Sequence, residues 1–327
     1  MPVSVPTVEK CPSTYDQYEC KLNAEVQQIA KEQLNESDQT RGPSLIQLRE
    51  FIAKHPQIGA CRTDAIFLLR FLRSTKFNVM AACELLERYL IIRDTMPNHF
   101  KRIDPADENL RSALEKAIVV PLGVDAEGRH VVTIRFGTID PHKFTSQLVT
   151  LLCSLSFEMH LDEELLQVTG FVIVLDFANT TMAHFSLWSL EELKMIVAVI
   201  NDVLSLRLKE IHIVQLPKVA SMIMDYCLAA LSPKLKERIK FHKTPDALKD
   251  AIDESILPTI YGGKQSLEEA NEKFRQRAMQ ERERLLKQAD MFIDLSIPSP
   301  NANNNTGVHS SVADEAVIGS FRKLNVD

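Results

Sequence analysis

Short β-branched runs alternate with longer helical segments between residues 117 and 243, and this alternation limits the folds open to the chain. The runs are Ile118–Pro121, Val131–Arg135, Phe171–Asp176, Ile211–Gln215 and Ile239–His242. A turn-like stretch joins the first two, whereas helical segments over 144–168, 187–205 and 218–231 separate the later ones. Strands connected by helices of this length lie parallel, with the helices packed on the sheet. The alternation therefore predicts an α/β domain with a mainly parallel sheet.

The residues before this region have helical periodicity throughout 15–116. Leu45, Leu48 and Ile52 share one apolar face, and Asn78 can cap the helix that follows it. A small helical domain is therefore expected in front of the sheet.

The residues after the sheet region are strongly polar. Ser266 and Glu269 form a capping box that opens a charged helix, and Pro298–Asn305 is of low complexity. We therefore expect the chain to contain successive segments with different roles. They are an N-terminal helical extension over 1–40, a helical domain over 41–112, the sheet domain over 113–265, the charged helix over 266–294 and a mobile tail over 295–327.

Charge and hydropathy argue against two classes of protein. With 44 acidic and 38 basic residues the net charge is −6, which disfavours a surface built to hold nucleic acid. No apolar run reaches the roughly 20 residues that a membrane-spanning helix needs. We expect no nucleic-acid partner and no transmembrane segment.

Signatures of catalysis and cofactor binding are missing. The sequence has no GxGxxG, GxxxxGK[ST], GxSxG or HExxH pattern. The histidines at 130, 160, 184 and 212 have no second ligand at metal-binding spacing. Asp176 ends a strand, where a functional role and a capping or sheet-edge role are both open. We expect a protein that is not an enzyme and that holds no cofactor and no metal.

The six cysteines are scattered without CxxC spacing, and the polar N-terminus lacks the apolar core of a signal peptide. Both features indicate reduced thiols and a cytoplasmic location.

The segment 218–231 is apolar on two sides. Ala220, Met224, Cys227 and Leu231 share one face, whereas Val219, Ile223 and Tyr226 share another. Two interpretations are open. The segment is either a helix buried in the core, or a lid that closes an apolar cavity with one face and offers the other to a membrane.

Basic residues gather after this segment. Between Ser232 and Lys243 five cations stand against Glu237 alone, and Arg207 and Lys209 precede the strand that leads into the segment. The five are Lys234, Lys236, Arg238, Lys240 and Lys243. A basic cluster beside an exposed apolar helix is typical of proteins that bind anionic membrane surfaces.

Several motifs together are similar to the CRAL-TRIO lipid-binding proteins, with the alpha-tocopherol transfer and retinaldehyde-binding branch the nearest. They are Phe67–Arg73, the Asp125-x-x-Gly128-Arg129 turn, the strand ending in Asp176 and, above all, Leu257–Gly263. The resemblance covers about residues 40–275, and Gly319–Leu324 is similar to a tail found in relatives. It implies a helical N-terminal domain, then a sheet domain whose apolar pocket is covered by a gate helix at about Val219–Leu231.

The resemblance also implies site residues. The pocket lining would be Leu175, Trp188, Ile196, Val199, Ile200, Leu204, Leu206, Ile211, Cys227 and Leu231. The gate would contact the membrane through Val219, Ile223 and Tyr226, and phosphoinositide head groups would bind Arg207, Lys209, Lys234, Lys236 and Arg238. A further basic position of that cleft is Thr75 here.

These features favour a cytoplasmic carrier, peripheral and transient at membranes, that binds one lipophilic molecule such as a tocopherol or a retinoid. Its other partner would be an anionic membrane surface that contains phosphoinositides. Two alternatives remain: a phospholipid or phosphatidylinositol exchange or presentation protein, and an interaction scaffold that transfers nothing.

Overall fold

The β-branched runs form a five-stranded sheet in the order β2-β3-β4-β5-β6, within a computed structural model that describes residues 5–298. The strands are β2 (Val119–Val124), β3 (His130–Arg135), β4 (Phe171–Asp176), β5 (Leu208–Val214) and β6 (Ile239–His242). β2 and β3 pair antiparallel, and β3 to β6 are parallel. The predicted α/β fold with a mainly parallel sheet is confirmed.

The connecting helices share one face of this sheet. Because strands that are neighbours in the sheet follow one another in the chain, right-handed crossovers place their helices on the same side. These helices are α7 (Ser146–His160), α8 (Glu164–Thr169), α9 (Met182–Phe185), α10 (Leu190–Asp202), the 3-10 helix η2 (Lys218–Ala220), α11 (Ser221–Ala230) and α12 (Pro233–Lys236). The segment predicted over 144–168 is thus two helices, and that over 187–205 starts only at Leu190.

The opposite face of the sheet is covered by the residues that follow β6. Alternate strand residues such as Val131, Val172 and Val174 pack there against Leu248, Leu257 and others. The covering elements are the 3-10 helices η3 (Pro245–Asp250) and η4 (Thr259–Tyr261) and the start of α13 (Leu267–Gln280). This face has its own apolar core, which leaves the helix-bearing face to form the site.

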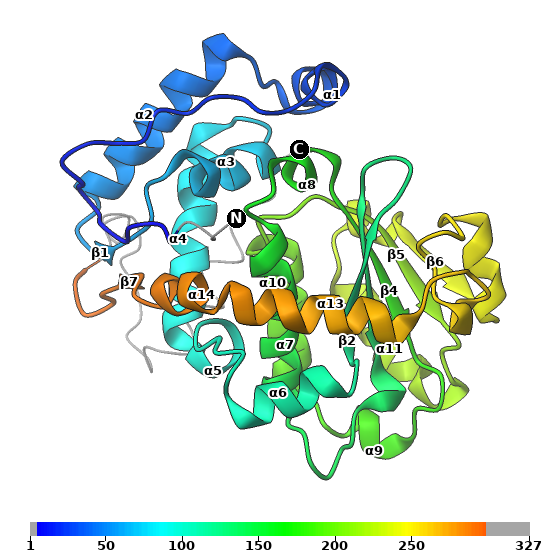
Figure 1. Ribbon diagram of the computed structural model, residues 1–327. Coiled ribbons are helices and arrows are strands. Elements are labelled where there is room, and N and C mark those ends of the chain that lie inside the picture. Colours follow the sequence, from blue (N-terminus) through cyan, green and yellow to red (C-terminus); the bar gives the residue numbers. More distant parts are fainter. Residues whose placement is uncertain (1–4, 299–327) are drawn as a thin grey trace.

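The N-terminal part is mainly helical and lies to one side of the sheet (Figure 1, blue to cyan). Its helices are α1 (Ala24–Leu34), α2 (Asp38–Lys54), α3 (Ala65–Ser74), α4 (Val79–Thr95), α5 (Pro97–Phe100) and α6 (Glu108–Glu115), and a short 3-10 helix η1 (Phe136–Thr138) follows β3. Asn78 caps α4 through a hydrogen bond from the N–H of Ala81, as its position predicts.

The C-terminal part differs from the single charged helix predicted over 266–294. α13 ends at Gln280, α14 (Arg282–Gln288) begins after Glu281, and β7 (Phe292–Ile293) pairs with β1 (Ile58–Ala60). The helical prediction over 15–116 missed β1 because so short a strand has no periodicity of its own and its partner is remote in the chain. The tail predicted over 295–327, with its Gly319–Leu324 motif, lies almost wholly outside the described residues.

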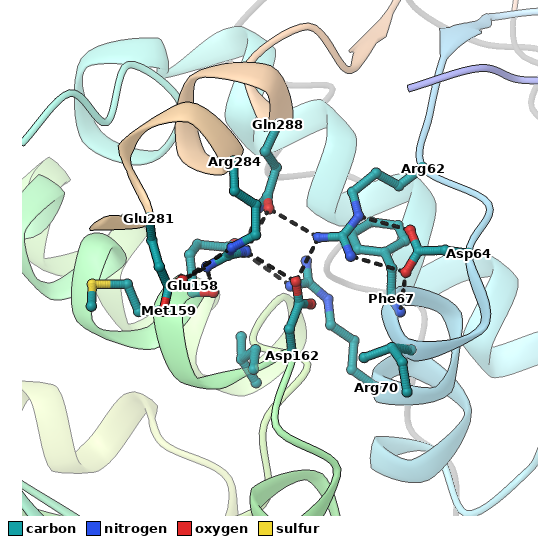
Figure 2. Close-up of polar contacts among 12 residues, drawn as sticks. Arg62, Asp64, Phe67, Arg70, Glu158, Met159, Asp162, Glu281, Arg284 and Gln288 are labelled. Atoms are coloured by element: carbon teal, nitrogen blue, oxygen red, sulfur yellow. Dashed lines mark hydrogen bonds and ion pairs between the residues drawn. The ribbon is translucent and has the colours of Figure 1, made fainter. Parts of the chain in front are cut away.

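A buried ionic network ties α14 to α3 and to the end of α7 (Figure 2). Arg70 on α3 donates to Glu158 on α7 at 2.9 Å, and Gln288 on α14 donates to the same carboxylate at 2.5 Å. Arg284 and Arg62 each donate to Asp162, at 3.0 and 2.8 Å. The network joins three segments that are far apart in the sequence.

Within residues 5–298, none of the helices combines the length and the apolar character needed to cross a bilayer.

Candidate functional site

An apolar cavity of about 310 Å³ lies between the sheet and the helices on its crossover face. Its floor comes from alternate residues of neighbouring strands, since Ile173 pairs with Ile211 and Leu175 with Ile213. Its walls are residues of α7, α9, α10 and η2–α11. Almost all of the lining side chains are hydrocarbon or aromatic, so the cavity suits an apolar molecule.

The structure brings most of the predicted pocket residues to this cavity. Those that line it are Leu175, Trp188, Ile196, Val199, Ile200, Leu204, Ile211, Cys227 and Leu231. Leu206 is the exception, because it is buried beside a neighbouring polar cleft. The segment between α10 and β5 is irregular, so neither helical nor strand periodicity indicates which way Leu206 faces.

The segment η2–α11 forms one wall of the cavity, and one predicted residue faces differently from the prediction. Ile223 lines the cavity and does not belong to the outward face with Val219. Ile223 lies one turn before Cys227 in the same α-helix, so the two side chains share the face that lines the cavity. The outward face contains Val219 and Met222, which are 57% and 84% exposed, whereas Tyr226 is half-buried.

The C-terminal end of α11 is held by one side chain of α10. The amide of Asn201 donates to the carbonyl of Ala230 at 3.1 Å and accepts from the N–H of Ser232 at 3.0 Å. Lys236 also donates to the carbonyl of Ala229, at 3.2 Å. The C-terminal end of α11 is thus held by hydrogen bonds that water molecules can replace if the helix moves.

A polar cleft of about 640 Å³ adjoins the apolar cavity, because Ile200, Leu204 and Leu208 line both. Of the predicted head-group residues, the cleft contains Arg207, Lys209, Lys234 and Arg238. Lys236 does not line it and instead caps Ala229, as described above. The prediction for Lys236 is therefore not supported by its position.

The cations of the cleft lower one another's affinity for protons. Burial, followed by Arg207 and Arg238, lowers the pKa of Lys209 to about 8. Burial and then Arg238 lower the pKa of Arg207 to about 10, and burial with Arg238 and Lys76 lowers the pKa of Lys234. Positive charges held together in this way favour an anion between them.

Thr75 lies in the wall of the same cleft, and the next residue, Lys76, lines it too. Lys76 thus brings a basic side chain to the cleft beside Thr75. Arg88 also lines the cleft and was not predicted, together with the acidic Glu84 and Asp202. Arg88 lies on α4, far from the motifs, so no sequence signal pointed to it.

Asp176, whose role was open, has structural partners. Its Oδ2 accepts from the hydroxyl of Tyr261 at 2.8 Å, and its Oδ1 accepts from the N–H of Ala178 at 2.9 Å. The Tyr261 hydroxyl also contacts Thr133 at 2.8 Å. The Leu257–Gly263 motif thus fastens the segment after β6 to the end of β4, and these contacts account for Asp176 without a role in binding.

The chain is similar to several known proteins. The family model described as "CRAL/TRIO domain" matches residues 114–263. Human Clavesin-2 is 29% identical over 244 residues, which cover 74% of this chain and 75% of that protein. The human alpha-tocopherol transfer protein-like protein is 29% identical over 249 residues, covering 75% and 72%. The crystal structure of Sfh5 is similar with a TM-score of 0.47 at 12% identity, over 78% of this chain and 93% of that one.

The family match covers the sheet, most residues of the apolar cavity and the motif at Leu257–Gly263, whereas the motif at Phe67–Arg73 precedes it. The relatives each match about three quarters of the chain. The name of the second relative refers to alpha-tocopherol transfer, which is the branch that the sequence resembles. Residues 114–263 match the CRAL/TRIO domain, which confirms the family resemblance recognised in the sequence.

Proposed function

We propose that the protein is a carrier that encloses one apolar lipid and exchanges it at anionic membranes, where phosphoinositide head groups bind the basic cleft. The observation that carries the proposal is the arrangement of three adjoining features. An apolar cavity is closed by η2–α11, this segment exposes Met222, and the basic cleft shares Ile200, Leu204 and Leu208 with the cavity.

The apolar cavity supplies the binding energy. Each methylene group that moves from water into such a cavity contributes about 0.8 kcal/mol, so a hydrocarbon chain binds firmly without any reaction. Release then requires an alternative apolar environment, which a membrane provides when η2–α11 moves. A carrier of this kind works in the cytoplasm and attaches to membranes only transiently.

The surface around the gate supports docking to a lipid surface. Met182 on α9 and Leu190 on α10 are exposed like Val219 and Met222, and α9 contacts η2 while α10 contacts α11. These apolar side chains can enter the interface while Lys209 and Lys234 meet anionic head groups. A phospholipid exchange protein would use the same surface, so the cavity ligand decides between the two.

Extraction tests the function directly. Purified protein from cells is extracted with organic solvent, and the extract is analysed by mass spectrometry. A neutral lipid at about one molecule per chain supports the carrier. A stoichiometric phospholipid supports the exchange protein instead, and a chain that contains no lipid and takes up none from vesicles contradicts the carrier and favours a scaffold.

Met222 provides a test of gate insertion. Replacing it with aspartate should slow lipid transfer to vesicles roughly tenfold, because a charge replaces an apolar side chain that would be worth about 1.5–3 kcal/mol when buried in the interface. Lipid binding should stay unchanged, since Met222 is 84% exposed and does not line the cavity. Transfer is measured by fluorescence between donor and acceptor vesicles.

The matched control is Met279→Asp on α13, where a methionine is 50% exposed away from the gate. This variant should transfer lipid at the normal rate. Equal rates for Met222→Asp and the unaltered protein would contradict insertion through this face. Ile223 is unsuitable for the test because its side chain lines the cavity.

Lys209 should make vesicle binding depend on pH. Its pKa of about 8 means that it is charged below that pH and neutral above it. Binding to phosphatidylcholine vesicles that contain phosphatidylinositol bisphosphate should therefore weaken about fivefold between about pH 7 and about pH 9. This factor corresponds to about 1 kcal/mol, the contribution of one basic residue near the lipid surface. Cosedimentation at each pH measures the effect.

The variant Lys209→Arg serves as the control, because an arginine stays charged across this range. Its binding should be nearly constant. If the variant and the unaltered protein lose binding in parallel, Lys209 does not contact the head group.

A further inference from the structure

The hydroxyl groups that line the apolar cavity already donate their protons to backbone carbonyls. Thr150 donates to the carbonyl of Ser146 at 2.9 Å, and Thr180 donates to that of Phe177 at 2.7 Å. Ser154 donates to the carbonyls of His99 and Thr150, each at 3.0 Å. Cys153 and Cys227 offer only thiols, which are weak donors.

His184 differs from these residues because one of its ring nitrogens has a fixed role and the other is free. It occupies the third position of α9, where the backbone N–H of Thr181 donates to its Nδ1 at 3.0 Å in a capping box. An Nδ1 that accepts this bond carries no proton, so the neutral ring has its proton on Nε2. The cap therefore sets the tautomer.

The Nε2–H group of His184 has no hydrogen-bond partner among residues 5–298. Its Nε2 atom keeps some accessible surface, although the residue as a whole is only 8% exposed. His184 is one of the residues that line the cavity, so a ligand that contacts the accessible edge of its ring meets this neutral donor. Trp188 also lines the cavity, and its indole N–H has no partner among the described residues, so His184 is one of two strong donors there and is the one that a helix cap holds in place.

We propose that His184 orients the ligand by donating from Nε2 to a single acceptor oxygen, and that the ligand is a neutral lipid with a carbonyl, ester, ether or hydroxyl oxygen at the end next to α9. This inference rests on the proposed carrier function. The hydrocarbon body of such a lipid lies against Leu175, Ile200 and Cys227. A phosphate or carboxylate is a poor occupant, because its charge would lie in an apolar cavity that offers only neutral donors.

The matched ligands methyl palmitate and hexadecane test the donor, since they differ mainly by an ester group. We expect the protein to prefer methyl palmitate over hexadecane by about three- to tenfold, the usual worth of one neutral hydrogen bond. Palmitate should bind more weakly than methyl palmitate. Binding is measured by partition of each labelled lipid from phosphatidylcholine vesicles to the protein.

Two variants separate this role from the cap. His184→Gln keeps an oxygen for the N–H of Thr181 and an amide N–H for the ligand, so the preference for methyl palmitate should persist. His184→Phe fills the space of the ring without a donor, so hexadecane should bind as before and the preference should disappear. Melting temperatures identify any loss of fold, and the ratio of the two affinities is independent of the amount of folded protein.

The possible outcomes are distinct. If the unaltered protein binds both lipids equally, or if His184→Phe retains the preference, the orienting role is wrong and the carrier function stands. If the unaltered protein takes up neither lipid, the carrier function is wrong and the orienting role fails with it.

Discussion

Replacing Glu158 with alanine should lower the free energy of unfolding by about 3–5 kcal/mol, which corresponds to roughly 10 °C in the melting temperature. The carboxylate accepts from Arg70 and from the hydroxyl of Tyr89 at 2.9 Å each, and from Gln288 at 2.5 Å. Without it the guanidinium of Arg70, whose side chain is 0% exposed, keeps its charge and loses its partner. Thermal unfolding followed by circular dichroism measures the change.

The pKa of Glu158 gives this prediction a pH dependence. Burial alone would raise that pKa, but the positive charges of Arg70 and Arg93 lower it by more than burial raises it, to about 2. The group therefore contributes stability above the ordinary pKa of a glutamate, about 4.3, and this contribution disappears as the pH falls towards 2. The destabilisation by Glu158→Ala should accordingly be full at neutral pH and smaller in acid.

A control distinguishes the buried network from ion pairing in general. Glu50→Ala removes an exposed partner of Lys54 on α2 and should change stability by less than about 1 kcal/mol. The double variant Arg70→Met with Glu158→Leu should recover part of the loss, because it removes both charges of the closest pair and deprives only Arg93, 3.8 Å from the carboxylate, of that partner. A single variant Glu158→Ala as stable as Glu50→Ala would show that water replaces the carboxylate.

The network also shows where prediction from the sequence stops. Phe67–Arg73 was recognised as a motif, and the structure gives its physical meaning: Arg70 and Arg73 are both buried, with carboxylate partners on other segments. Those partners, Glu158 for Arg70 and Glu36 for Arg73, lie on α7 and between α1 and α2. Pairing across such distances has no period in the sequence.

Two of the strands, β4 and β6, have the predicted bounds, whereas β2 and β5 differ from theirs by up to three residues at one end. In β4 a short apolar run rich in β-branched residues ends at Asp176. The helical segment over 144–168 contains a break at Leu161–Glu163 that periodicity alone did not indicate. Ile223 was grouped with Val219, although its i, i+4 spacing to Cys227 also allowed the cavity face on which it lies.

The cleft shows the same division between local and remote signals. Lys234 and Arg238 belong to one run of basic residues and were found together, whereas Lys76 and Arg88 come from the helical part and were missed. The cleft residues that follow the gate segment in the chain, Lys234 and Arg238, were thus predictable. Those supplied by the packing of α3 and α4 on the sheet domain were not.

Reversing two charges in the cleft, Lys209→Glu with Lys234→Glu, should weaken binding to vesicles of phosphatidylcholine and phosphatidylinositol bisphosphate at least about 30-fold. Each lysine near the surface is worth about 1 kcal/mol, and two therefore account for that factor before the repulsion by the new carboxylates is added. Arg207 and Arg238 are left in place, because they also donate to the carbonyls of Val168 and Leu208. Cosedimentation across a range of salt concentrations measures the affinity.

The control for this reversal is Lys273→Glu with Lys287→Glu on α13 and α14, which changes the net charge equally but outside the cleft. A protein attracted only by its overall charge would respond to both pairs alike. A protein that holds a head group in the cleft would respond to the first pair alone, and its affinity would depend less on salt after the reversal. Lipid uptake in the absence of anionic vesicles should be the same in both double variants, because neither pair lines the apolar cavity.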